Sequence, residues 1–301
     1  DVAGLAVDRL FRSPYLPDPH VMAVFRSAWC DASGDAFNSA GLMLGMKHGS
    51  SSWSHGHADV GSFVLDLGGV RWIEDLGLPN YENKTAIYRR STAGHNTLLI
   101  NGADQPGFAS FCWEPGRWHQ CRYGRAALVT FNGSDTASTD AFSVLELGQV
   151  YPPTTVAGWR RGFATLATRT GVLVVDEYNS TANTSTVQWT VHTHATVNVA
   201  ADGASAVLST PTGSTTRGAA ALAVSLRVLE PSASSDFKLE VVPLNVYNDK
   251  NYPDVGLVKL VLSLSPAAVA ASRRLAVQIG TAAAVKGQVR PLSAWKEHGP
   301  F

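Results

Sequence analysis

The chain has 301 residues, of which 45% are hydrophobic, and it carries 24 basic and 24 acidic side chains. This length and apolar content are enough for one large domain, or two ordinary ones, with a substantial core. The balanced charge excludes a whole-surface attraction to nucleic acid or anionic lipid, so we expect no nucleic-acid partner. No apolar run is long enough to cross a bilayer, so we expect no membrane span.

The first predicted element is a short helix. In DVAGLAVDRLFR, residues 1–12, small and apolar side chains recur at roughly helical spacing without strand-like alternation. The chain starts at Asp1 without a leader segment, which favours a processed or trimmed piece of something larger. We therefore interpret residues 1–16 as a helical remnant or linker from a preceding domain and residues 17–301 as the main domain.

After residue 20 the pattern changes to short strands. Runs rich in Val, Leu, Ile, Thr and Trp alternate with Gly, Pro, Asn and Asp, and no later segment has convincing helical periodicity. The runs include VMAVFRSAW, AGLMLGMKHG, FSVLELGQVY, WRRGFATLAT, TGVLVVDEY, VQWTVHTH, KLEVVPLNVY, LVKLVLSL and RRLAVQIG. This pattern predicts an all-β fold, a large antiparallel β-sandwich.

One hairpin can be predicted residue by residue in SFVLDLGGVRWIED, residues 62–75. Its Gly-Gly pair suits a two-residue turn with positive φ. The turn pairs Leu67 with Val70, Asp66 with Arg71, Leu65 with Trp72, and Val64 with Ile73. The cross-strand charge pair supports this register, which places Asp75 opposite Ser62. Because His57 has the other parity, we expect a bulge or break at Gly61 to bring His57 and Asp75 to one face.

Two histidines one glycine apart begin this region, in WSHGHADVGSF at residues 53–63. In an extended chain His55 and His57 would share a face, roughly 7 Å apart. Asp75 follows the hairpin, and His95 precedes the strand-like run NTLLI. Two imidazoles and a carboxylate suit a tetrahedral Zn²⁺ with water in the fourth position. The chain has nine histidines, however, so spacing alone does not distinguish such a site from ordinary hydrogen-bonded histidines.

The region resembles a known family. The run NSAGLMLGMKHGSSSWSHGHADVGSFVLDLGGVRWIEDLG, followed by YRRSTAGHNTLLINGADQ, is similar to the C-terminal β-sandwich domain of the heparinase II/III-like polysaccharide lyases, which include heparin, heparan and several alginate lyases. H-x-H-x-D-x-G-S-F, the later D-x-G and R-S-T-x-x-H-N-T-L are specific when taken together. The resemblance is strong over about residues 20–105 and diffuse afterwards. It implies a supersandwich-like fold that follows an α/α toroid.

The resemblance also implies a site. By motif position, His57, Asp75 and His95 would bind zinc, and His55 would lie in the substrate cleft and take part in catalysis. The implied reaction is β-elimination at a uronic acid, in which the C5 carboxylate is neutralised, the C5 proton removed and the departing O4 protonated. Neutral imidazole suits a base or a hydrogen-bond partner near pH 7. For His55 both proton transfer and binding of the substrate carboxylate remain open.

Further candidates lie in the loop between two expected ligands. In some members of the family a tyrosine or arginine from this loop assists at the cleft, and here Tyr81 and Arg89 are the candidates, with Tyr88 and Arg90 beside them. An arginine fork would suit a uronate carboxylate. The alternative is that these side chains are plain surface or core residues.

The chain departs from the family pattern in two respects. Ser54 stands where the family commonly has Asn. The family's catalytic tyrosine, and the side chain that neutralises the substrate carboxylate, lie in the N-terminal toroid, which this chain lacks. We therefore expect the chain alone to bind zinc and cleave little, with the toroid supplied by the same precursor or another chain. The alternative is a secreted, non-catalytic glycan-binding or structural module derived from this domain.

Other features have simpler interpretations. Asp59 is expected to brace its loop, and Asn96 to hold the turn beside His95. A second H-x-H, His192 and His194, has no evident acidic or cysteine partner and is interpreted as core or cleft lining. Four tryptophans either fill the sandwich or stack on sugar rings: Trp53, Trp72, Trp113 and Trp118.

Compartment and substrate are less constrained. N-x-[ST] sequons favour a secreted glycoprotein, and they begin at Asn83, Asn132, Asn179 and Asn183. Cys112 and Cys121 could close a short disulfide loop and leave Cys30 over, which keeps the pairing open. The neutral charge argues against a dedicated reader of heavily sulfated heparin and leaves alginate-like or glucuronan-like uronate polymers open.

Overall fold

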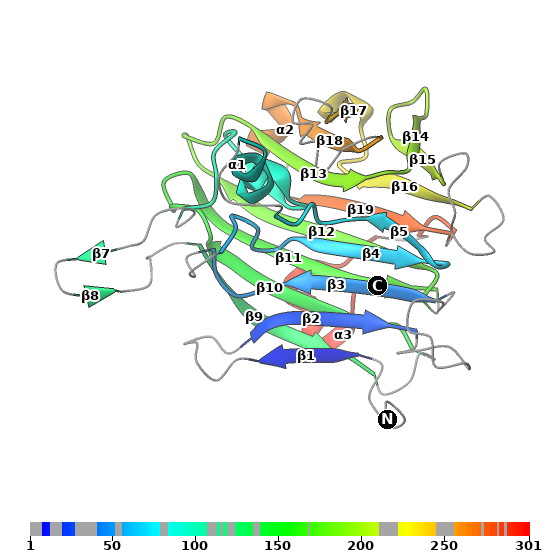
Figure 1. Cartoon of the computed structure of the whole chain (residues 1–301), viewed down its shortest axis with the longest axis horizontal. Coiled ribbons are helices and arrows are strands. Elements are labelled where there is room, and N and C mark those ends of the chain that lie inside the picture. Colours follow the sequence, from blue (N-terminus) through cyan, green and yellow to red (C-terminus); the bar gives the residue numbers. More distant parts are fainter. Residues whose placement is uncertain are drawn as a thin grey trace.

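The structure, a computed structural model, describes residues 8–12, 20–27, 41–51, 56–78, 84–106, 113–114, 117–118, 124–134, 139–167, 169–210, 222–244, 256–271, 274–281, 283–285 and 288–301. These residues form mainly antiparallel strands, arranged in three larger sheets and one two-stranded ribbon (Figure 1). The all-β prediction is therefore confirmed. No helix of the described residues is long and apolar enough to cross a membrane.

The first sheet has five antiparallel strands in chain order. They are β1 (Arg9–Arg12), β2 (His20–Arg26), β3 (Leu42–Lys47), β4 (Phe63–Leu67) and β5 (Val70–Ile73). In β3 and β4 buried side chains alternate strictly with partly exposed ones, because successive residues of a strand point to opposite faces. This sheet therefore buries one face.

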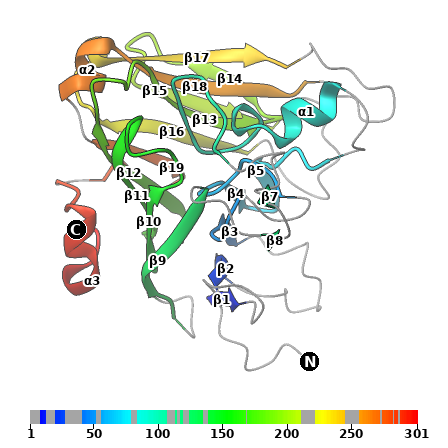
Figure 2. The same ribbon diagram turned by 90° about the vertical axis from the view of Figure 1, so that its left-hand side faces the viewer.

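The largest sheet has eight strands and forms the opposite layer of the sandwich (Figure 2). In spatial order they are β14 (Thr196–Val199), β15 (Ser205–Ser209), β16 (Ala223–Glu230), β19 (Arg274–Gly280), β12 (Gly171–Ser180), β11 (Val156–Leu166), β10 (Phe142–Gln149) and β9 (Arg125–Asn132). Its central strands β11, β12 and β19 contain long runs of buried residues, which indicates cover on both faces.

The third sheet continues the layer of the five-stranded sheet and also faces the largest one (Figure 2). Its order is β17 (Phe237–Pro243), β18 (Val258–Leu264), β13 (Val187–Thr193) and β6 (Leu98–Ile100). The ribbon consists of β7 (Trp113–Glu114) and β8 (Arg117–Trp118). The helices are α1 (Lys84–Arg90), α2 (Pro266–Ala271) and α3 (Trp295–His298), with 3-10 turns η1 (Thr92–Gly94), η2 (Ser234–Asp236) and η4 (Leu292–Ala294).

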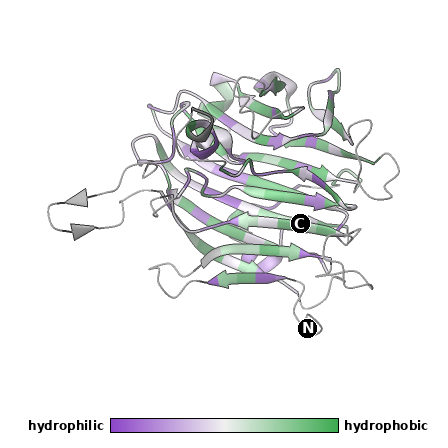
Figure 3. Ribbon diagram, in the orientation of Figure 1, coloured by the Kyte–Doolittle hydropathy of each residue, from purple (hydrophilic) through white to green (hydrophobic). Residues whose placement is uncertain are grey.

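One hydrophobic core lies between the two layers. Phe63 on β4 contacts Phe163 on β11 and Trp189 on β13, with ring centroids 5.7 and 6.2 Å apart. These three rings join all three larger sheets. The strands of both layers are coloured mainly as hydrophobic in Figure 3, as expected for a sandwich with a shared interior.

The prediction of an N-terminal helix is wrong for residues 9–12. Arg9–Arg12 form β1 and pair with β2, while residues 1–7 and 13–19 lie outside the described residues. The buried Asp8 carboxylate anchors this strand through a two-pronged ion pair with Arg169 (2.6 and 2.7 Å). Pairing and anchoring outweigh the weak local preference for helix. A domain boundary near residue 16 stays a prediction.

The hairpin prediction is correct at the turn and wrong beyond it. Gly68 and Gly69 have φ of 66° and 77°, and the two pairs next to them form as expected. Leu65, however, pairs with Ile73, so Trp72 is an extra residue in β5. The bulge lets Trp72 enter the core, where its indole N–H donates to the Leu67 carbonyl (2.8 Å).

The predicted break at Gly61 is present as a tight turn. Gly61 has φ of 81°, and the Ser62 N–H donates to the Asp59 carbonyl (2.9 Å). A side chain at Gly61 would lie 3.2 Å from Leu147 and would adopt a strained backbone conformation, which explains why glycine stands there. Turn and bulge together bring His57 and Asp75 to the same ring, that of His95.

Candidate metal centre

Three chain segments meet at one end of the five-stranded sheet. They are the turn at residues 56–62 before β4, residues 74–78 after β5, and the chain around His95 between η1 and β6. The turn is fixed at both ends, because the Ala58 N–H donates to the Arg90 carbonyl (2.9 Å) and the Lys47 N–H donates to the Ser62 carbonyl (2.8 Å). The side chains that these segments present are therefore held by backbone pairing.

The two imidazoles at the centre of the site lie next to each other. The ring centroids of His57 and His95 are 5.2 Å apart. Nδ1 of His95 is 2.9 Å from Oδ2 of Asp75, whereas its buried Nε2 has no hydrogen-bond partner among the described residues. A buried ring nitrogen without a partner is costly and points to a bound group.

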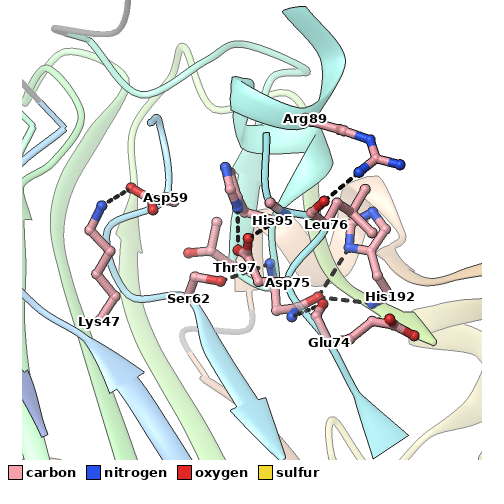
Figure 4. A network of polar contacts seen from close by, with 12 residues as sticks. Lys47, Asp59, Ser62, Glu74, Asp75, Leu76, Arg89, His95, Thr97 and His192 are labelled. Carbon is pink, nitrogen blue, oxygen red and sulfur yellow. Dashed lines mark hydrogen bonds and ion pairs between the residues drawn. The ribbon is translucent and has the colours of Figure 1, made fainter. Parts of the chain in front are cut away.

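Two carboxylates belong to the site: Asp75 lies beside His95, and Asp59 lies next to Lys47 (Figure 4). His57, Asp59 and His95 each offer a ligand atom, all within 4.8 Å of one another. Asp59 is buried and also forms an ion pair with Lys47 (2.5 Å), which matches the expected bracing role. Asp75 contacts His95 and accepts a hydrogen bond from the Gly77 N–H (2.8 Å). The structure thus brings the three predicted ligands into one neighbourhood and adds Asp59.

The protonation states favour cation binding. Partial burial alone would raise the pKa of Asp75, but hydrogen bonds from His95 and from the Gly77 N–H, with the charge of His95, bring that pKa well below its usual range. Burial lowers the pKa of His57, and the neighbouring His95 lowers it further. An ionised carboxylate beside a neutral imidazole is the state in which both groups bind metal.

The residues present fit a zinc ion. Two imidazole nitrogens and one or two carboxylate oxygens form a donor set that Zn²⁺ accepts. The partnerless Nε2 of His95 is the observation that favours a bound cation over a simple hydrogen-bonded cluster. If Asp75 holds the Nδ1 proton of His95, it acts as the carboxylate that commonly orients a metal-binding histidine.

The other predicted site residues have different outcomes. His55 and Tyr81 lie outside the described residues, as do Trp53 and Ser54. Arg89 is buried, and its guanidinium donates to the Leu76 carbonyl, so it holds the segment that carries Asp75.

The tryptophans and the second H-x-H motif also have specific places. Trp72 fills the core, and Trp113 and Trp118 are cross-strand partners in the ribbon. His192 is fully buried, whereas His194 is exposed and pairs with Glu74 (2.6 Å) beside Asp75.

Asn96 holds the turn beside His95, as the sequence suggested. Its side-chain amide donates to the carbonyls of Phe63 (2.8 Å) and Glu74 (2.9 Å). Thr190 adds a hydrogen bond from its hydroxyl to the His95 carbonyl (2.8 Å). The strand ends next to the site are therefore tied to one another by buried polar side chains.

Sequence reasoning missed three of the polar side chains that support the site. Gln105 is buried and pairs with both backbone groups of Val60 (2.9 and 3.0 Å). Arg161 and Asp176 face each other across β11 and β12 beneath the site. The available signal was a charge inside each of the apolar runs WRRGF and VVDEY, but only the register of the strands shows that the two charges meet.

Fold and site together define a class, namely an antiparallel β-sandwich with a candidate metal centre, lined by histidines and carboxylates, at the end of one sheet. The family model described as heparinase II/III-like, C-terminal, matches residues 27–244. The chain belongs to this family, and the resemblance inferred from the motifs is confirmed. A comparison with curated protein sequences gives no match.

Solved structures with the same fold include lyases of this kind. Heparan sulfate lyase HepC from Pedobacter heparinus has a TM-score of 0.60 and 14% sequence identity, covering 86% of this chain and 35% of its own. A heparinase III structure has a TM-score of 0.58 and 15% identity, covering 89% and 36%. Another heparinase III gene product has a TM-score of 0.58 and 13% identity, covering 90% and 35%. The chain thus spans about a third of these proteins, with which it shares the fold.

Proposed function

We propose that this chain is the zinc-binding β-sandwich part of a polysaccharide lyase that cleaves uronic-acid-containing glycans by β-elimination. The observation that carries the proposal is the cluster of His57 and His95 with flanking carboxylates, in which Nε2 of His95 is buried without a partner among the described residues. Membership of the heparinase II/III-like family supports the reaction class.

The ligand set follows from the same cluster. His57 and His95 would supply nitrogen ligands. Asp75 would be the carboxylate ligand if the ion binds the Nδ1 side of His95; if the ion binds the partnerless Nε2, Asp59 would be that ligand and Asp75 would orient the ring. A zinc ion bound there would supply a fixed positive charge that holds the turn at residues 56–62 against the segment around His95. Because β-elimination consumes no water, we assign the site an organising role and not the activation of water.

The chain's own residues would then act at the substrate. His55 stands two residues before His57 in the sequence, and we assign it proton transfer or binding of the uronate carboxylate. Tyr81 is a candidate for assisting at the cleft. Arg89 contributes by holding the segment after Asp75. The remaining neutralisation of the C5 carboxylate would come from a toroid domain, in the same precursor or another chain.

A secretory location fits this function. Three of the sequons present asparagines that are exposed on the surface, namely Asn132, Asn179 and Asn183. Exposure is the condition that N-glycosylation requires of its acceptor. Glycopeptide mass spectrometry of the natural protein would check the proposed location.

The metal proposal is tested by elemental analysis and zinc titration of the chain. We expect one zinc per chain, lost in His57→Ala, and a Kd about 10- to 100-fold higher in Asp75→Asn than in the wild type. His298→Ala, which removes a histidine in the C-terminal helix α3, is the control and should bind normally. Full zinc occupancy in His57→Ala would contradict the ligand assignment. If Asp59→Asn loses zinc and Asp75→Asn keeps it, Asp59 is the carboxylate ligand.

The reaction is tested by ultraviolet absorbance of the unsaturated product on a panel of alginate, glucuronan and heparan sulfate. The chain alone should give little product, and any longer gene product that contains it should be active on one polymer. His55→Ala should abolish that activity and leave zinc content unchanged. No product on any polymer, with zinc bound, would instead support the non-catalytic glycan-binding module.

A further inference from the structure

Arg161 is a charged residue in the middle of the sandwich. It lies on β11, directly across from Asp176 on β12, and both side chains are fully buried. The two form a bidentate ion pair, in which Nε donates to Oδ1 (2.7 Å) and Nη2 to Oδ2 (2.9 Å). Removing two charges from water is unfavourable, so a buried pair needs further hydrogen bonds to satisfy its remaining groups.

The remaining hydrogen bonds of Arg161 lead to the candidate metal centre. Its Nη1 donates to the Gly61 carbonyl (2.8 Å) and to the Asn96 carbonyl (3.1 Å). Gly61 belongs to the turn that presents His57, and Asn96 directly follows His95. One guanidinium nitrogen on the large sheet therefore contacts both segments that supply the imidazoles.

The orientation of this guanidinium is fixed by its surroundings. Oδ1 of Asp176 also accepts a hydrogen bond from the Trp159 indole (2.7 Å), which holds the carboxylate in place. The guanidinium carbon lies 5.5 Å from the Trp159 ring centroid and 6.0 Å from that of Phe163. A planar fork held on this many sides presents Nη1 in one direction.

We propose that Arg161, aligned by Asp176, is a positioning residue of the metal centre. It sets the separation of the segments that carry His57 and His95, and thereby the affinity of the site for its ion. This inference rests on the proposed function, because it takes the ion site as given. The affinity for the ion would then depend on the Arg161 guanidinium, which lies in the opposite sheet and contacts no ligand side chain.

The chain contains a matched control for this ion pair. Arg169 and Asp8 form a second bidentate pair whose side chains are also fully buried (2.6 and 2.7 Å). Nη1 of Arg169 also donates to the Arg26 carbonyl (2.7 Å), so this pair holds β1 and β2 to the large sheet. Arg169→Lys therefore removes the same kind of bidentate guanidinium interaction, but from a pair that anchors the N-terminal strands.

The test titrates the metal-free chain with Co²⁺ or Zn²⁺ in the wild type, Arg161→Lys and Arg169→Lys, and records thermal unfolding of each. We expect Arg161→Lys to raise the metal Kd at least about tenfold and to change the visible absorption of the Co²⁺ form. The metal Kd of Arg169→Lys should stay within about threefold of the wild-type value, even if its unfolding midpoint falls by as much as that of Arg161→Lys.

A second variant covers the case in which Arg161→Lys does not fold. Arg161→Met with Asp176→Leu replaces the pair by apolar side chains of similar size, a change that often leaves stability intact. It should also raise the Kd. Wild-type affinity in whichever Arg161 variant folds, or equal weakening by Arg169→Lys, would overturn the positioning role alone. A wild-type chain that binds no ion would overturn the proposed metal site and this inference with it.

Discussion

At the scale of single residues, Asn96 determines the state of a buried histidine. Its Nδ2 donates to two carbonyls, so its Oδ1 must face His192, where it accepts from the backbone N–H (2.8 Å) and from Nδ1 (3.0 Å). His192 therefore carries a proton on Nδ1. Its Nε2 lies 3.1 Å from the Tyr88 hydroxyl oxygen, and that hydroxyl also has the Ala93 carbonyl as an acceptor (3.0 Å). Full burial of the ring favours the neutral imidazole.

Acid should therefore destabilise the protein through His192. Burial lowers the pKa of His192 well below its usual value, and the nearby Lys259 lowers it further. Because the folded-state pKa is depressed, below about pH 6.5 the unfolded chain binds a proton that the folded chain excludes, and stability falls as the pH drops. Between pH 7.5 and 5.0 the metal-free wild type should lose up to about 2 kcal/mol more than His192→Gln.

Urea unfolding of both proteins at the two pH values measures this difference. Other groups titrate in both proteins and cancel in the comparison. Equal losses of unfolding free energy in the wild type and in His192→Gln would show that His192 does not couple folding to protons.

At the scale of elements, a buried ion pair determines where the first strand lies. Asp8 accepts hydrogen bonds from the backbone N–H groups of Arg26 (3.1 Å) and Ser134 (2.8 Å), in addition to its two bonds from Arg169. These contacts join the start of β1 to the ends of β2 and β9. Among the described residues, β1 lies at the edge of its sheet and pairs only with β2, so it depends on this anchor.

Asp8→Ala should thus destabilise the protein strongly. It leaves the Arg169 guanidinium buried without its carboxylate, which typically costs about 3–5 kcal/mol. The control is Asp66→Ala on the hairpin, where the partner Arg71 is 46% exposed; exposed pairs contribute at most about 1 kcal/mol. Denaturant unfolding compares the two, and a loss for Asp8→Ala no larger than that for Asp66→Ala would contradict the anchoring role.

The same elements show what could be predicted from the sequence. The period of two and the Gly-Gly turn predict the strands and the turn of the hairpin, because both depend on local geometry. The bulge at Trp72 depends on how its indole fits the core, and the conversion of residues 9–12 to a strand depends on Asp8 meeting Arg169, 161 residues away.

The site could be predicted to a similar extent. Motif positions brought His57, Asp75 and His95 together, and the structure places all three in one neighbourhood. The support that Arg161 and Gln105 give to the site could not be predicted, because these contacts depend on the pairing of distant strands and on the packing of one sheet on the other. His55 and Tyr81 stay predictions.

At the scale of the whole molecule, the largest sheet is covered on both faces. The two smaller sheets cover its inner face, and the C-terminal segment with η4 and α3 covers part of its outer face (Figure 2). A second hydrophobic cluster forms there and includes Phe142, Val144, Leu173, Val175, Leu292 and Trp295. Gly162 permits this contact, because a side chain there would lie 2.3 Å from Leu292 and 2.9 Å from Trp295.

Trp295 should be a major contributor to global stability despite its place near the end of the chain. It is fully buried, packs its ring on Phe142 (6.1 Å between centroids) and donates its indole N–H to the Arg290 carbonyl (3.0 Å). Trp295→Ala should therefore lower the free energy of unfolding by about 3–5 kcal/mol.

Phe301→Ala is the comparison, since that ring is 41% exposed and its loss should change stability by no more than about 0.5 kcal/mol. Because η4 and α3 lie on the face of the large sheet opposite to the candidate metal centre, Trp295→Ala should also leave the proposed metal affinity unchanged at temperatures where it is folded. Denaturant unfolding and zinc titration measure the two quantities separately. A Trp295→Ala protein as stable as Phe301→Ala would show that the outer-face cluster adds nothing to the fold, and a weakened metal site would show that the two faces are coupled through the sheet.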